Sequence, residues 1–310
     1  MQSQTQNRRI RERHDARTGW AFMAPFFIMF LLVFAVPICV AIYQSFFRQV
    51  ASGGGLYGSG ELENQFVGFD NFTMVITSAD FWTGMGRVVV YAAFQIPIMI
   101  ISALVLALVL DSFLVRRVGL FRLSYFLPFA IPGIVAAMVW LYIYTPELSP
   151  IVKFFDSFGI HIDFMAPGAP ILASMANMTT WTYTGYNMLI FLAALQAIPH
   201  ELYEAARLDG ATSWQIVRQI KVPMVSGAAL LAVLLSIIGT IQLFNEPAVM
   251  QSANGWMGNA YTPMMMAYNT MFGTISPGGD GPASAISIVM ALVAGGLAVI
   301  YALLQRKTLR

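Results

Sequence analysis

ELYEAARLDGATSWQIVRQIKVP, residues 201–223, carries six charged side chains in a chain that is otherwise poor in charge. Asp209 and Gly210 supply a turn that ends one short helix, because glycine readily adopts the left-handed conformation of a helix C-terminus. Thr212 and Gln215 have the spacing of a capping box, which begins a second helix that Pro223 then ends. Apolar runs flank the stretch on both sides. The pattern therefore predicts a preformed pair of polar helices between two membrane spans.

The composition of the whole chain supports this reading. Hydrophobic residues make up 58% and charged residues 10%, against roughly 25% charged in ordinary soluble domains. A helix needs roughly 20 apolar residues to cross a bilayer. A transmembrane barrel needs short alternating segments, whereas these runs are continuous. We expect an all-α polytopic membrane protein with six transmembrane helices, at about residues 20–43, 88–110, 123–144, 171–197, 224–245 and 283–304.

The distribution of Lys and Arg predicts the orientation in the membrane. The first apolar run is longer than the core of a signal peptide and lacks a small-residue cleavage site, so we interpret it as a retained anchor. With the N-terminus inside, 14 of the 17 Lys and Arg residues fall on the cytoplasmic side, as the positive-inside rule requires. We therefore expect a basic cytoplasmic segment at 1–19, a transmembrane domain at 20–304 and a cytoplasmic tail at 305–310. The basic ends reflect topology, and no nucleic-acid partner is expected.

Several classes of chemistry have no support in the sequence. None of the six runs contains Asp, Glu, Lys or Arg, which disfavours an ion-coupled carrier, although a sodium site made only of neutral oxygens stays open. A phosphate-binding loop for ATP is missing, since no Gly-Lys dipeptide occurs anywhere. Cys39 is the single cysteine, and the three histidines are isolated from one another, so neither a metal site nor an enzyme is expected. Any ATPase would be a separate polypeptide.

Polar and helix-breaking residues inside the runs indicate a passage. Pro128 and Pro132, followed by Gly133, predict a bend in the third run because each proline removes a backbone donor. Nine polar or aromatic residues crowd the fourth run, more than a single helix contact needs, and they favour a wet cavity over simple helix-to-helix bonding. These residues are Asn177, Thr179, Thr180, Trp181, Thr182, Tyr183, Thr184, Tyr186 and Asn187.

A family resemblance joins these features. The pattern Glu204-Ala-Ala-x-x-Asp-Gly-Ala211, followed by Ile220-x-Val-Pro223, resembles the EAA motif of permease subunits of ATP-binding-cassette (ABC) importers, where leucine usually stands at the place of Val222. Further stretches, over residues 20–304, are similar to the carbohydrate branch of that family, the maltose and oligosaccharide permeases. They are FVGFDNF (66–72), LPFAIP (127–132), LQAIP (195–199) and LFNEP (243–247).

The resemblance implies a type I ABC importer permease fold in the bacterial inner membrane and a division of labour along the chain. The loop at 199–223 would be the coupling helix that docks on a cytoplasmic ATPase subunit. Its contact residues would be Glu204, Ala205, Ala206, Asp209, Gly210, Ala211 and Pro223. A sugar would pass a site lined by the middle of the third, fourth and fifth runs. The lining residues would be Phe129, Gly133, Thr179, Thr182, Tyr183, Tyr186, Asn245 and Glu246, to which we add Gln242, one turn below.

The resemblance also implies the partners and the cargo. A second homologous permease, two ATPase subunits and an external solute-binding protein would complete the importer, with ATP and magnesium bound by the ATPases and no cofactor bound by this chain. The expected cargo is a disaccharide or oligosaccharide, because aromatic rings and neutral polar groups suit a neutral sugar. Glycerol phosphate, a polyamine or an amino acid stays open as an alternative solute, and an ion-coupled secondary transporter remains the rival mechanism.

Overall fold

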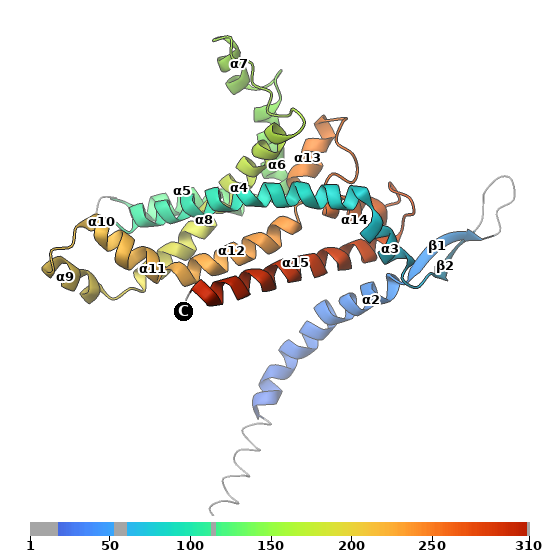
Figure 1. The fold of residues 1–310 in the computed structure, drawn as a ribbon, viewed down its shortest axis with the longest axis horizontal. Helices are drawn as coiled ribbons and strands as arrows, with labels where there is room; N and C mark the ends of the chain where they lie inside the picture. The colour runs from blue at the N-terminus through green and yellow to red at the C-terminus, as the bar shows by residue number, and fades with distance from the viewer. Residues whose placement is uncertain (1–17, 53–60, 113–115, 309–310) are drawn as a thin grey trace, which may run out of the picture.

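The computed structural model describes residues 18–52, 61–112 and 116–308. The basic residues of the N-terminal segment up to Arg17 lie outside the described residues. A helical bundle forms most of the molecule, with one long helix standing apart from it and one small hairpin at an end (Figure 1).

The first apolar run forms a helix over Thr18–Gln44. It includes a π-helical stretch η1 (Leu31–Ala35) and α2 (Val36–Gln44). None of the side chains in its most apolar window is buried in this chain. The helix meets the bundle where α2 packs against the last helix.

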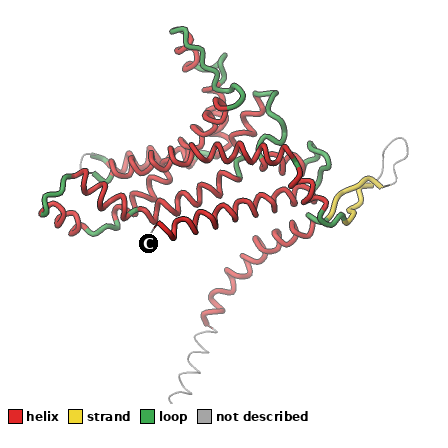
Figure 2. Tube along the Cα trace, in the orientation of Figure 1, coloured by secondary structure: helices red, strands yellow, loops and turns green. Residues whose placement is uncertain are grey.

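The chain then makes an element that the sequence patterns did not predict, an antiparallel hairpin of β1 (Phe47–Ser52) and β2 (Glu61–Phe66) with Phe47 opposite Phe66. Figure 2 shows these strands at one end of the helical molecule. The hairpin is fastened to α3 (Asp70–Thr77) by the fully buried Asn71, whose side chain accepts from the Arg48 guanidinium and donates to the Ser45 and Phe47 carbonyls. The Asn71 amide is therefore enclosed and fully used by the fold.

The second apolar run lies within helix α4 (Ala79–Leu110). This helix begins nine residues before the run and is capped by Ser78. The third run is a broken span. Helices α5 (Val118–Ala130) and α6 (Gly133–Tyr144) meet at an angle of 95° at Ile131 and Pro132, which confirms the predicted bend. The short helix α7 (Pro150–Asp156) follows α6.

The fourth run is the straight helix α8 (Ala169–Gln196), which packs along α4 and α5. Gly185 makes the contact with α5 possible, because a Cβ atom there would collide with the backbone carbonyl of Tyr125. Buried apolar side chains of α8 contribute to two of the three core clusters, one shared with α6 and α13, the other with α4 and α12.

Short helices α9 (His200–Leu208), α10 (Ser213–Ile216) and α11 (Val222–Met224), with a π-helical turn η2 (Val217–Lys221), make up the polar stretch. Pro223 does not end the helix as expected. The bend of 57° comes at Val225 instead, because the π-helical turn before the proline accommodates the missing donor. Helices α12 (Ser226–Ile241), α13 (Asn245–Ala253), α14 (Pro263–Met271) and α15 (Asp280–Thr308) complete the chain.

Length and apolarity identify three of the described helices as able to cross a membrane, and up to five if each of the two bent pairs is one span. Six spans were expected. The difference is α8, which has 28 residues but carries the polar cluster and is too polar to qualify on composition. The expected tail after residue 304 is also partly helical, since α15 runs on to Thr308. Helices α9 to α11 and the end of α15 lie at one end of the bundle, opposite the hairpin (Figure 1).

Candidate functional site: a central cavity and a capped helical segment

The polar stretch forms a rigid projection at the end of the bundle, which we call the coupling segment (residues 199–223). Helix α9 ends at Leu208, directly before the predicted Asp209-Gly210 turn, in which Gly210 has a φ of +81°. The Gly210 amide donates to the Arg207 carbonyl at 3.0 Å and the Ala211 amide to the Ala206 carbonyl at 2.9 Å. This pair of bonds is the Schellman arrangement that satisfies the last carbonyls of a helix.

The N-terminus of α10, in the second half of the segment, is also capped. The Gln215 side chain accepts from the Thr212 amide at 2.7 Å, and the Gln215 amide donates to the Thr212 hydroxyl at 3.4 Å. These reciprocal bonds confirm the predicted capping box. The turn that joins α9 to α10 is thus hydrogen-bonded on both sides, so the two helices can move as one body.

The structure brings the expected contact residues to the surface of this projection. Glu204, Ala205, Asp209, Gly210 and Pro223 are exposed, while Ala206 and Ala211 are half-buried. Two large apolar side chains that were not among the expected contacts stand beside them: Leu208 is 90% exposed and Trp214 is 70% exposed. In the sequence, both are large apolar residues within a charged stretch, and this pattern could have predicted their role as surface contacts.

The second feature is a cavity of about 240 Å³ inside the bundle, between α4, α8, α12 and the start of α13. Of the expected lining residues, the structure places six at this cavity: Thr179, Tyr183, Tyr186, Gln242, Asn245 and Glu246.

Three expected lining residues lie elsewhere. Thr182 is buried on another face of α8 and donates to the Met178 carbonyl at 3.0 Å. Phe129 lies behind the lining and stacks on Tyr186, with ring centroids 4.7 Å apart. Gly133 packs against Asn245, and a Cβ atom there would lie 2.6 Å from the Asn245 amide nitrogen. These residues support the wall without forming its surface.

Helix α4 lines the cavity as well, which motif matching missed. Tyr91, Gln95 and Met99 follow one another at helical spacing and face the cavity. The signal was the presence of Tyr91 and Gln95 in an otherwise apolar run. Asn187 of α8 and Ser236, Gly239 and Thr240 of α12 complete the polar part of the wall.

A chain of hydrogen bonds links the walls through Glu246. The Tyr91 hydroxyl donates to Thr179 Oγ1 at 2.6 Å, and the Thr179 hydroxyl donates to Glu246 Oε1 at 2.8 Å. Sequence reasoning placed Glu246 just beyond the end of the fifth span. In the structure α12 ends at Ile241, the chain turns over residues 242–244, and Glu246 begins α13 against the cavity. The start of a helix is a favourable place for a carboxylate.

Among the described residues that line the cavity, Glu246 is the only Asp, Glu, Lys or Arg. The remaining surface combines aromatic rings, hydroxyls and amides, a chemistry that suits a neutral polar molecule with apolar faces. The lining therefore provides hydrogen-bond partners on at least two walls.

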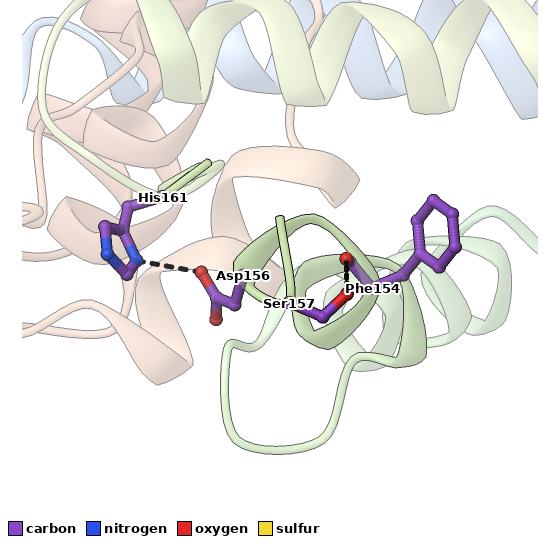
Figure 3. Close-up of polar contacts among 4 residues, drawn as sticks. All are labelled: Phe154, Asp156, Ser157 and His161. Atoms are coloured by element: carbon purple, nitrogen blue, oxygen red, sulfur yellow. Dashed lines mark hydrogen bonds and ion pairs between the residues drawn. The ribbon is translucent and has the colours of Figure 1, made fainter. Parts of the chain in front are cut away.

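A second polar contact, near α7, is of a different kind. His161 Nδ1 lies 2.9 Å from Asp156 Oδ1 beyond α7, and the neighbouring Ser157 hydroxyl donates to the Phe154 carbonyl at 2.7 Å (Figure 3). Both members of the His161–Asp156 pair are open to solvent, so this contact holds a loop and carries little energy.

Comparisons with known proteins agree on the kind of molecule. Residues 99–310 match the family model described as binding-protein-dependent transport system inner membrane component. The lactose transport system permease protein LacF of Rhizobium radiobacter is 29% identical over 273 residues, which cover 86% of this chain and 88% of LacF. The probable ABC transporter permease protein YurN of Bacillus subtilis is 27% identical over 270 residues, covering 83% of this chain and 89% of YurN.

A solved structure shares the fold. A chain of a bacterial alginate ABC transporter, crystallised in complex with a periplasmic protein that holds an alginate pentasaccharide, matches with a TM-score of 0.73 at 18% identity. The match covers 96% of this chain and 97% of that chain.

Proposed function

Because the chain belongs to the family of binding-protein-dependent transport system inner membrane components, we propose that it is a membrane-spanning permease subunit of an ATP-driven importer and that it carries a neutral disaccharide or oligosaccharide. The observation that carries the choice of cargo is the cavity. Its aromatic rings, amides and hydroxyls match the two faces of a sugar ring, and no Lys or Arg is among its lining residues. Relatives named for lactose, trehalose and starch products support the same cargo class.

The coupling segment takes the role of the contact with the ATPase. Glu204 pairs with a basic residue of that subunit, Ala205 and Ala206 permit close approach, and Leu208 and Trp214 supply apolar area. The exposed position of these side chains and the double capping of the segment support this role. ATP and magnesium belong to the ATPase subunits, and this chain binds neither.

The same assignment orients the chain. The coupling segment and both termini face the cytoplasm, and the hairpin and α7 face the outside, where a solute-binding protein delivers the sugar. Clustering of basic residues at one end supports this orientation, since Arg116, Arg117, Arg207, Arg218 and Lys221 all belong to the loops or segments there. A second, homologous permease and two ATPase copies complete the complex.

The cargo is tested by purifying the complete complex, reconstituting it in vesicles and measuring ATP hydrolysis with its solute-binding protein and a panel of solutes. The panel contains lactose, trehalose, maltooligosaccharides, glycerol phosphate, a polyamine and amino acids. We expect stimulation by a neutral saccharide. Stimulation by glycerol phosphate, polyamine or amino acid alone would reassign the cargo.

The energy source is tested in the same vesicles. Uptake should continue when the proton and sodium gradients are collapsed while ATP is kept high, because neither gradient drives an ATP-powered importer. Loss of uptake under these conditions would favour an ion-coupled carrier.

The docking role is tested by Gly210→Asp. No atom lies within 4 Å of a Cβ atom at Gly210, so the substitution costs only the left-handed backbone, about 1–2 kcal/mol. We expect the variant to insert and assemble while sugar uptake per ATP hydrolysed falls by about tenfold or more, the size of a typical coupling energy. Gly159→Asp is the matched control, because Gly159 also has a positive φ of +75° and open surroundings but lies in an outer loop. Full uptake by Gly210→Asp would refute docking at this segment.

A further inference from the structure

A partly buried ion pair ties the coupling segment to the bundle. Lys221 is the last residue of the π-helical turn, and Asp111 immediately follows the last residue of α4. Lys221 Nζ lies 2.5 Å from Asp111 Oδ2, and the two side chains are only 14% and 15% exposed. Residues 110 positions apart in the sequence thus make a charge-assisted hydrogen bond that is partly shielded from solvent.

Helix α9 joins the same contact. Lys221 Nζ lies 5.2 Å from the centroid of the Tyr203 ring, within the range of a cation–π interaction. The Tyr203 hydroxyl is buried without a hydrogen-bond partner among the described residues, so the ring is the part of Tyr203 that contacts the ammonium group. Burial, followed by the neighbouring Asp111 carboxylate, raises the Tyr203 pKa, and the hydroxyl stays neutral.

The environment of the pair is apolar on the bundle side. Leu110, next to Asp111 in the chain, and Val225, four residues after Lys221, are buried in the core cluster that α4, α8 and α12 share. Such surroundings strengthen the attraction between the charges and make a lone charge costly. The pair therefore stays closed while the surrounding packing is intact.

No other ion pair within the described residues connects the segment to the bundle. Glu201, Glu204, Arg207 and Asp209 are exposed, and none of them forms an ion pair with another described residue. The π-helical turn places Lys221 as its final residue, and such turns occur often at functional positions. The charged connection is thus confined to one point.

That point lies on the helix that forms one wall of the cavity. Helix α4 stays helical from Tyr91, Gln95 and Met99 to Leu110, next to Asp111, although Pro97 removes one backbone donor within this stretch. At a rise of 1.5 Å per residue, the wall residue Gln95 lies roughly 24 Å along the helix from Asp111. A displacement of the α4 end is therefore carried to Tyr91, which holds Thr179 and through it Glu246.

We propose that the Asp111–Lys221 pair, seated on Tyr203, is the link that makes α4 move together with the coupling segment, so that an ATPase acting on the segment shifts the α4 wall of the cavity. Asp111 and Lys221 are positioning residues, since neither touches the sugar or the nucleotide. The inference rests on the proposed function and adds to it the route by which the motion enters the bundle.

The test uses the complete reconstituted complex with its solute-binding protein and measures sugar uptake and ATP hydrolysis together. Asp111→Asn and Lys221→Gln should lower uptake per ATP hydrolysed by about tenfold, within the range of typical coupling energies. Lys221→Arg, which keeps the charge, and Tyr203→Phe, which keeps the ring, should retain most of the coupling. Asp80→Asn, at the opposite end of α4, and Lys153→Gln, on α7, are exposed matched controls and should behave as wild type.

The charge-swapped double variant Asp111→Lys with Lys221→Asp decides between a link and a merely structural pair. Recovery of assembly and of uptake per ATP supports the link. Unchanged coupling in assembled single variants overturns the proposal, as does a swapped variant that assembles normally but stays uncoupled. Failure of every variant, including Lys221→Arg, to assemble would also overturn it, since the two positions would then serve folding alone. Absence of uptake in the wild type would instead refute the proposed function.

Discussion

In soluble proteins the apolar segments are usually the buried ones. The helix over residues 18–44 and helix α8 show the opposite relation. The first is among the most apolar segments of the chain, and none of its most apolar window is buried. Helix α8 is too polar to qualify as a span by composition, yet thirteen of its residues are buried. The reason is the solvent: lipid tails accept apolar side chains, whereas hydroxyls and amides must find partners inside the bundle. Hydropathy here indicates which helix meets lipid.

The largest effect on stability is expected where α8 contacts the backbone of α5. Gly185→Val should cost more than about 3 kcal/mol, beyond the usual range for overpacking, because the added atoms meet the Tyr125 carbonyl and not a flexible side chain. The matched substitution Gly86→Val in α4 meets nothing within 4 Å and should be nearly neutral. Unfolding of the purified full chain by SDS, followed by circular dichroism, measures both. Similar stability of the two variants would mean that α5 and α8 do not approach so closely.

A leucine pair tests the comparison directly. Leu192 of α8 is 2% exposed and Leu32 of the first helix is 58% exposed. Leu192→Ala should cost about 2 kcal/mol, at the low end for buried leucine because the unfolded reference is still in an apolar solvent. Leu32→Ala should leave the same SDS titration unchanged in the isolated chain. A cost for Leu32→Ala that appears only in the assembled complex would show that a partner subunit covers this helix.

The smallest effect on stability is expected from one hydroxyl. Thr179→Val removes the link between Tyr91 and Glu246 and should cost about 1 kcal/mol, typical for hydrogen bonds between membrane helices. Thr184→Val is its control, because the Thr184 hydroxyl bonds only to the Thr180 carbonyl of its own helix. Uptake by the reconstituted complex should fall for Thr179→Val alone. Equal uptake by both variants would show that the hydrogen bonds from Tyr91 through Thr179 to Glu246 are not needed for transport.

Local patterns predicted the features whose causes are local. The capping box at Thr212, the left-handed turn at Gly210 and the break at Pro132 each depend on residues within one turn of chain, and the structure contains all three. Motif matching also located most of the cavity-lining residues of α8 and the start of α13. It failed for Thr182, because side chains on adjacent faces of one helix look the same in sequence.

Features that depend on contacts between distant segments were beyond the sequence. The hairpin depends on Asn71 meeting the Ser45 and Phe47 carbonyls. The depth of Glu246 depends on where α12 stops, and the α4 wall becomes visible only when α4 packs along α8. The hydropathy of a run predicts whether the helix can lie in lipid, but it does not predict which other helices pack against it.

The sequence by itself determined that this chain is a bundle of membrane helices with a capped polar segment between two of them, since composition and capping act through solvent and nearest neighbours. Only the tertiary structure decided which side chains enclose the cavity and that Lys221 meets Asp111, because these pairings join residues that lie 67 to 110 positions apart. Their geometry follows from close approaches such as Gly185 on Tyr125, which fix how the helices pack.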